Sequence, residues 1–130
     1  MVTGLFLGRF QPFHLGHLDA IKQILKICDH CIILVGSAQY KNQPDNPFSY
    51  EERKAMIETT LKKENIQNWS IIPIDDIRDN DLWVEYVDKN TPKYDVVYTG
   101  NPLTEKLFSK AGYPVRKLDI NIKISGRELR

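Results

Sequence analysis

Residues 8–17 read Gly-Arg-Phe-Gln-Pro-Phe-His-Leu-Gly-His, and what flanks this stretch decides the fold. The apolar run Val2–Leu7 precedes it, which is typical of a strand buried on both faces. Apolar residues at helical spacing follow it and predict a helix from about Gly16 to Cys28. The stretch is therefore predicted to join a strand to a helix, which is where open α/β sheets bind their ligands.

The residue types in this junction indicate a phosphate site. Gly8 and Gly16 let an anion approach the backbone, and the unpaired N–H groups of a helix start attract phosphate. Arg9 adds a fixed positive charge. His14 and His17 lie three residues apart across the helix start, so both imidazoles are predicted to face one spot. Together these groups predict a site for a polyphosphate.

Composition limits the class of protein. The 130 residues suit one domain over residues 1–130, with 42% hydrophobic and 27% charged residues and a net charge of +1. This near-neutral balance argues against an extended nucleic-acid interface. No apolar run is long enough to span a bilayer, and no signal peptide is visible. We therefore expect a soluble cytoplasmic protein that binds a small ligand.

Cys28 and Cys31 form a Cys-x-x-Cys pair. A redox pair would open a helix after a strand, but this pair lies where a helix ends and a strand begins. A zinc site would need two further ligands, and only His30 is near. We expect two cysteines packed at an element boundary, because free Cys behaves as a small buried hydrophobe.

The rest of the chain alternates strands with helices. Further strands are predicted at Cys31–Val35, Trp69–Ile74, Tyr94–Thr99 and Val115–Leu118, and further helices at 50–64, Leu82–Val87 and Leu103–Ala111. This order predicts an α/β fold, a Rossmann-like open parallel sheet of about five strands with helices on both faces. Segments 36–39, 75–81 and 100–103 each follow a strand, so we expect all three on the same edge of the sheet as the first junction.

Polar residues mark two of the helix starts. Ser49 and Glu52 form a capping box, and Asp79 or Asp81 is predicted to cap the helix at Leu82–Val87. The carboxylates of residues 75–81 also raise a metal-site hypothesis, but a polar loop with a helix cap is favoured. Arg53, in the first turns after Ser49, is expected to be solvated, the alternative being a contact with a nucleotide.

The junction resembles the signature of the His-x-Gly-His nucleotidyltransferase superfamily. Within it the resemblance is strongest to the archaeal type of nicotinamide mononucleotide (NMN) adenylyltransferase, because further segments match that family: Asn46-Pro47-Phe48, Leu82-Trp83-Val84, Gly100-Asn101-Pro102-Leu103 and residues 124–130. The resemblance implies transfer of the adenylyl group of ATP to NMN, giving NAD and pyrophosphate. It also implies Mg²⁺ held mainly by the phosphates of ATP and by water, with no protein metal site. A homo-oligomer stays open, because archaeal relatives are often oligomeric, and composition predicts no nucleic-acid or membrane partner.

The resemblance also implies which residues form the site. The catalytic residues would be Arg9, His14, His17 and Arg130. The ATP-binding residues would be Gly8, Arg9, Phe10, His14, Gly16, His17, Gly100, Asn101, Ser125 and Arg130. The NMN-binding residues would be Phe10, Ser37, Gln39, Asn80 and Trp83. Trp83 would stack on the nicotinamide ring, the alternative being a tryptophan packed in the core.

Two departures from the family pattern leave alternatives open. Arg127 stands where the family has a threonine, and the chain stops at Arg130, without the further helical segment of the archaeal enzymes. The chain is either a short natural form or a truncated one. Three other functions stay open: a related transferase that uses phosphopantetheine, FMN, or CTP with a phosphoalcohol; a nucleotide-binding module with little catalysis; and a redox protein.

Overall fold

Five parallel strands form one open sheet in the order β3-β2-β1-β4-β5. The structure, a computed structural model, describes residues 2–10, 12–38, 47–75, 77 and 79–117. Its strands are β1 (Thr3–Gly8), β2 (His30–Val35), β3 (Trp69–Pro73), β4 (Val96–Thr99) and β5 (Val115–Lys117). Its helices are α1 (Leu15–Ile27), α2 (Tyr50–Lys63), α3 (Asn80–Asn90) and α4 (Pro102–Lys110). The predicted α/β fold with a parallel sheet is confirmed.

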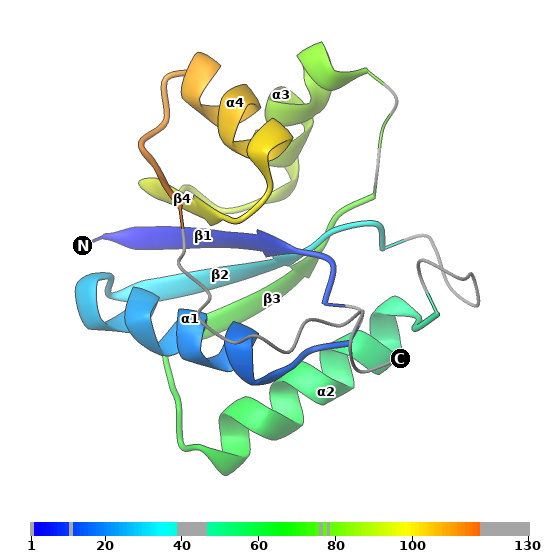
Figure 1. The fold of residues 1–130 in the computed structure, drawn as a ribbon, viewed down its shortest axis with the longest axis vertical. Coiled ribbons are helices and arrows are strands. Elements are labelled where there is room, and N and C mark those ends of the chain that lie inside the picture. Colours follow the sequence, from blue (N-terminus) through cyan, green and yellow to red (C-terminus); the bar gives the residue numbers. More distant parts are fainter. Residues whose placement is uncertain (1, 11, 39–46, 76, 78, 118–130) are drawn as a thin grey trace.

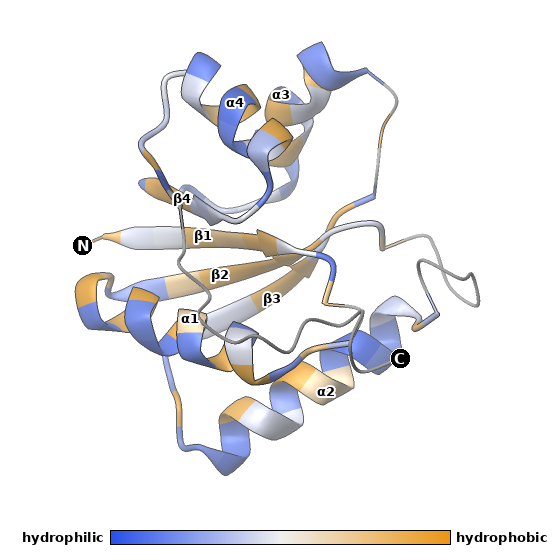
Figure 2. Cartoon of the chain, viewed as in Figure 1, coloured by the Kyte–Doolittle hydropathy of each residue, from blue (hydrophilic) through white to orange (hydrophobic). Residues whose placement is uncertain are grey.

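Helices cover both faces of the sheet, as Figure 1 shows: α1 and α2 lie on one face, and α3 and α4 lie on the other. The strand pleat explains the division, because successive side chains point to opposite faces. Phe6 of β1 packs in the core on the α1 and α2 side, whereas its neighbour Leu5 packs in the core beneath α3 and α4. The central strands are therefore apolar along their length, and the hydrophilic residues gather on the outer sides of the helices (Figure 2).

The helix caps predicted from the sequence are present. Ser49 Oγ accepts from the backbone N–H of Glu52 at 3.1 Å, and the Glu52 carboxylate accepts from the N–H of Ser49 at 3.0 Å. Asp79 Oδ1 accepts from the N–H of Asp81 at 2.9 Å. Helix α3 extends beyond the predicted Leu82–Val87 at both ends: it begins directly after this Asp79 cap, and it continues to Asn90. The other element ends lie close to those predicted.

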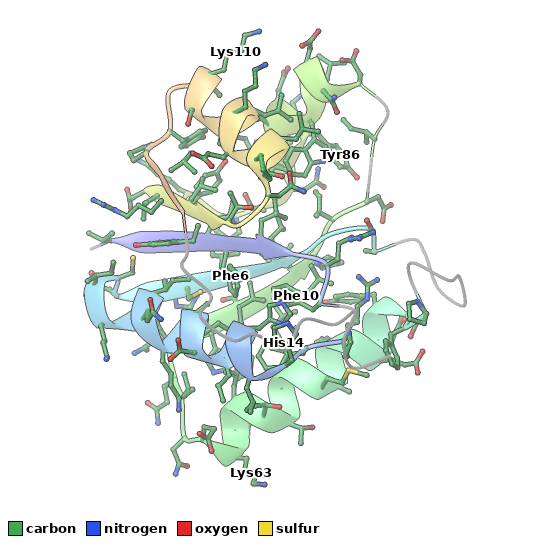
Figure 3. The ribbon with its side chains drawn as sticks, in the orientation of Figure 1. Phe6, Phe10, His14, Lys63, Tyr86 and Lys110 are labelled. Atoms are coloured by element: carbon green, nitrogen blue, oxygen red, sulfur yellow. The ribbon has the colours of Figure 1, made fainter. Side chains whose placement is uncertain are left out.

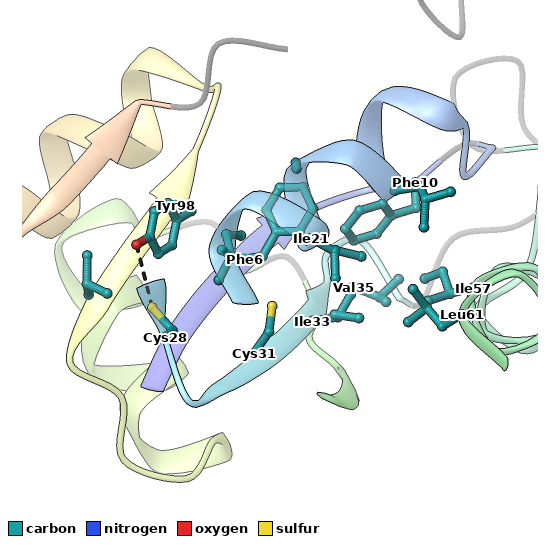
Figure 4. Packing of buried hydrophobic residues seen from close by; sticks show 14 residues of the cluster. Phe6, Phe10, Ile21, Cys28, Cys31, Ile33, Val35, Ile57, Leu61 and Tyr98 are labelled. Atoms are coloured by element: carbon teal, nitrogen blue, oxygen red, sulfur yellow. Dashed lines mark hydrogen bonds between the residues drawn. The ribbon is translucent and has the colours of Figure 1, made fainter. Parts of the chain in front are cut away.

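Both cysteines are free thiols packed in the core. Cys28 Sγ lies 3.6 Å from the hydroxyl of Tyr98, and this contact is drawn in Figure 4. Burial raises the pKa of the Cys31 thiol, which makes it a poor nucleophile. The described residues hold no group of three or more His, Cys, Asp or Glu side chains placed to bind a metal. The expected packing role is confirmed for the pair.

Strand β1 lies at the centre of the sheet, between β2 and β4. The chain builds outward from β1 to β2 and β3 on one side, and then crosses to β4 and β5 on the other. This reversal beside β1 is the topological switch point at which such sheets bind ligands. No described helix is long and apolar enough to cross a membrane, and a cytoplasmic location stays a prediction.

Candidate functional site

A cavity of about 450 Å³ opens at the carboxyl ends of β1, β2 and β4. Gly8 and Arg9 line it from the end of β1, and Gly36 and Ser37 line it from the end of β2. The segment after β4 closes another side, and His17 and Trp83 also face the space. The segments predicted to converge after these three strands therefore meet around one cavity.

His14 and His17 cap the start of α1 reciprocally. The backbone N–H of Gly16 donates to Nδ1 of His14 at 3.0 Å, and the N–H of His14 donates to Nδ1 of His17 at 3.1 Å. The two rings stack with centroids 3.8 Å apart, so they converge as predicted. Because each Nδ1 accepts a hydrogen bond, the proton of each neutral ring must lie on Nε2. Both imidazoles therefore keep a donor for a ligand.

Aromatic rings surround His17. The ring centroids of Phe10 and Phe13 lie 4.8 and 5.5 Å from the imidazole of His17, and that of Phe6 lies 6.4 Å away. Burial, and secondarily the charge of His14, lowers the pKa of His17 to about 3. Burial also lowers the pKa of His14. At neutral pH the pair therefore acts as neutral hydrogen-bond donors, and the positive charge facing the cavity comes from Arg9.

Phe10 packs against His17 from within the core. Its ring is 2% exposed and does not line the cavity (Figure 3 labels Phe10 and His14). A Cβ on Gly8 would lie 3.0 Å from Cζ of this ring, so glycine at position 8 makes room for Phe10 as well as for a ligand. Gly16 is also buried, and its N–H is used by the His14 cap. These two glycines therefore shape the junction itself.

The expectation that Arg53 is solvated is wrong. Its side chain is fully buried, with an exposed fraction of 0%. The guanidinium donates to the backbone carbonyl of Arg9 at 2.9 Å, and to those of Gly36 and Ser37 at 2.8 and 3.1 Å. A buried charge needs such partners, and here they are carbonyl groups of the two strand ends that line the cavity.

Trp83 combines the two roles weighed for it. Its ring meets that of Phe108 edge-on, with centroids 5.6 Å apart, and so packs against the core of α3 and α4. It also lines the cavity. The indole of Trp83 is therefore available to a ligand that enters the cavity.

The segment after β4 is held by its own cap. Asn101 Oδ1 accepts from the N–H groups of Leu103 and Thr104 at 2.9 and 3.2 Å, which starts α4. The N–H of Asn101 donates to Oγ1 of Thr99 at 3.1 Å. Both threonines line the cavity, although sequence reasoning did not single them out. The sequence feature that could have identified these two threonines is their position on either side of Gly100, at the end of a strand.

Some predicted site residues are not brought to this cavity. Asn80 is exposed at the start of α3, where it lines a separate depression beside Lys110. Gln39, Ser125 and Arg130 lie outside the described residues, as does Arg127. Their roles stay predictions.

Comparisons with known proteins agree with this geometry. A protein named nicotinamide-nucleotide adenylyltransferase from Thermoplasma acidophilum is 52% identical over 112 residues, which are 86% of this chain. The protein of the same name from Methanococcus aeolicus is 48% identical over 131 residues, covering 99% of this chain and 76% of the relative. The chain spans 63% of the length of the Thermoplasma relatives.

Solved structures share the fold. A crystal structure of a bifunctional NMN adenylyltransferase/ADP ribose pyrophosphatase from Francisella tularensis superposes with a TM-score of 0.82 at 27% identity, over 98% of this chain and 40% of that one. A further structure of that name, complexed with AMP and a manganese ion, gives a TM-score of 0.79 at 28% identity, over 98% of this chain and 39% of that one. The model of the cytidylyltransferase-like family matches residues 5–130. The chain thus belongs to the cytidylyltransferase-like family, and it is related within that family to the nicotinamide-nucleotide adenylyltransferases.

Proposed function

We propose that this protein transfers the adenylyl group of ATP to NMN, producing NAD and pyrophosphate. The observation that carries the proposal is the cavity at the switch point, which is lined by two side chains able to donate to phosphate, His17 and Arg9, and by the flat indole of Trp83. The ring of His14 stacks on that of His17. A nucleotide substrate needs both kinds of contact, because its phosphates require donors and its bases require flat apolar surfaces. The names of the archaeal relatives support the same reaction.

The reaction needs positioning more than acid–base chemistry. An oxygen of the NMN phosphate attacks the α-phosphorus of ATP, and the bond from that phosphorus to the bridging oxygen of the leaving pyrophosphate breaks. The attacking oxygen is already an anion at neutral pH, so no side chain has to remove a proton. Catalysis then rests on aligning the two phosphates and stabilising the charge on the leaving group.

The junction after β1 fits the triphosphate. His14 and His17 would donate from Nε2 to phosphate oxygens, since each Nδ1 is already engaged in the cap. Arg9 would neutralise part of the triphosphate charge from the end of β1. Arg130 is proposed as a second cation for the leaving pyrophosphate, on the family resemblance alone.

The nicotinamide would lie toward α3. Trp83 lines the cavity there and would stack on the nicotinamide ring. Ser37, buried at the end of β2, lines the same space and would contact the NMN moiety. Gly100 and Asn101 would contact the ATP moiety from the end of β4.

A divalent cation is proposed to accompany ATP. The Francisella structure that is complexed with AMP and a manganese ion supports a divalent cation. Mg²⁺ is proposed for this chain on the family resemblance, with ligands drawn mainly from phosphates and water, as Mg²⁺ prefers. The ion would neutralise phosphate charge.

Pyrophosphate release tests the proposal directly. The purified protein should release pyrophosphate with ATP, Mg²⁺ and NMN, and NAD should form in equal amount. FMN, phosphopantetheine, and CTP with a phosphoalcohol should release little. The His17→Ala variant should lose at least about a hundredfold in turnover, because one preorganised donor is removed. Normal turnover in that variant would remove the role given to His17.

The same assay separates the alternatives. Release with another acceptor but not with NMN would keep the reaction and change the substrate. ATP binding by calorimetry without release from any acceptor would indicate a nucleotide-binding module.

A further inference from the structure

Arg9, Gly36 and Ser37 line the cavity, and their backbone is called the cavity floor below. The buried side chain of Arg53 makes hydrogen bonds to the carbonyl groups of all three. Its Nη1 donates to the carbonyls of Arg9 and Gly36, and its Nη2 donates to that of Ser37. Its Nε donates to the carbonyl of Ser49, at the N-cap of α2, at 3.2 Å. One side chain therefore joins the ends of β1 and β2 to the start of a helix.

The backbone at both strand ends is strained. Phe10 and Ser37 each have a φ of 53°, in the left-handed region that non-glycine residues rarely adopt. The carbonyls of Arg9 and Gly36 belong to the peptide groups that precede these residues, and both are bound by Arg53. Strained backbone of this kind persists only where its surroundings hold it in place. The guanidinium supplies that restraint at both corners.

The direction of these carbonyls matters for an anionic ligand. Parallel strands end in carbonyl groups, and an oxygen turned toward the cavity would repel a phosphate. The oxygens of Arg9, Gly36 and Ser37 instead point to a buried side chain that does not line the cavity. The guanidinium also places a permanent positive charge beneath the floor.

We propose that Arg53 is a positioning residue for the triphosphate, which clamps the left-handed corners at Phe10 and Ser37 and turns their neighbouring carbonyls away from the ligand. This inference rests on the proposed function, because it assumes that polyphosphate enters this cavity. Arg53 acts through the backbone and touches no reacting atom. Lysine cannot replace it, since one ammonium lacks the planar fork that reaches several carbonyls at once.

Ligand charge provides the test. The Arg53→Lys variant should bind ATP at least about tenfold more weakly than the wild type, because displaced contacts at a phosphate site are costly. Its affinity for adenosine, which carries no phosphate, should fall by less than about threefold, with AMP between the two. Affinities are measured by calorimetry well below the unfolding temperature of each ligand-free protein. The matched control is Lys54→Met, which removes an exposed cation from the adjacent position of α2 and should leave all three affinities unchanged.

A purely structural role predicts a different pattern. Arg53→Lys would then lower the unfolding temperature. It would reduce the affinities for ATP, AMP and adenosine by the same factor, or would leave all three affinities unchanged. Either result would overturn the inference. If NMN turnover is absent in the wild type while the graded loss appears, the proposed function fails and the clamp stands. If NMN turnover is present and the loss is not graded, only the clamp fails.

A second variant covers the case in which Arg53→Lys does not fold. Glycine adopts a positive φ without strain, so Ser37→Gly should reduce the need for the clamp. The double variant Ser37→Gly/Arg53→Lys should then fold, and compared with Ser37→Gly alone it should lose more affinity for ATP than for adenosine. An equal loss for the two ligands, or failure of the double variant to fold, would also overturn the inference.

Discussion

The titration of His17 provides a quantitative test of the site. Burial lowers its folded-state pKa to about 3, against 6.5 for the free side chain. Below pH 6.5 the unfolded chain therefore binds a proton that the folded chain does not. The resulting stability is present in full above pH 6.5, falls steadily with pH, and levels off near the folded-state pKa. Acid should therefore destabilise this protein through His17.

The size of the loss follows from linkage. Between about pH 8 and about pH 5, a group with these two pKa values costs about 2 kcal/mol of unfolding free energy. The figure depends almost entirely on the unfolded-state pKa, because the folded-state pKa lies well below pH 5. His17→Gln should abolish this part of the pH dependence, since glutamine does not titrate. Glutamine also accepts from an N-cap backbone N–H at this helix position, so the cap on α1 is retained.

The assay is urea unfolding of both proteins at the two pH values, followed by the fluorescence of Trp69 and Trp83. The wild type should lose about 2 kcal/mol more than His17→Gln on going from about pH 8 to about pH 5. Other titrating groups contribute to both proteins and cancel in the difference. An equal loss in the two proteins would refute the view that His17 is a buried neutral donor.

Two further predictions concern residues that line the cavity. Trp83→Ala should weaken NMN binding at least about tenfold in a calorimetric titration, because a stacking surface is lost. Trp83→Phe should retain part of the NMN affinity. An equal loss of ATP affinity in Trp83→Ala would contradict the assignment of Trp83 to the nicotinamide. Gly8→Ala should destabilise the fold by about 1–3 kcal/mol in urea unfolding, because the added Cβ would lie 3.0 Å from the ring of Phe10. Gly100→Ala is its control, since a Cβ there would meet nothing within 4 Å, and equal losses at both positions would show that the Phe10 contact is unimportant.

The fold was largely predictable because its signals are local. The apolar β2 run and the Ser49–Glu52 capping box each act over a few residues, and both are present in the structure. The convergence of His14 and His17 was predictable for the same reason, because three residues at a helix start bring two side chains to one face. Helix α3 was predicted too short, since the residues that the structure adds at its two ends, 80–81 and 88–90, are all polar and carry no apolar pattern.

The contents of the cavity were only partly predictable. Sequence order places the strand ends on one edge of the sheet, but it does not say which strands are neighbours. The order β3-β2-β1-β4-β5 brings Thr99 and Thr104 beside the junction, and it leaves Asn80 in a separate depression. These placements depend on packing between elements distant in the chain, for which a single sequence carries no direct signal.

The local order of residues was enough to predict the alternating strands and helices, the strand-to-helix junction with its two histidines, and the family. The burial of Arg53 could be seen only in the folded chain, because charged residues on helices are usually exposed and the sequence therefore favoured solvent for it. Its acceptors are backbone carbonyls of Arg9, Gly36, Ser37 and Ser49. Every residue has such a carbonyl, so these partners leave no mark on residue identity and become visible only when the chain is folded.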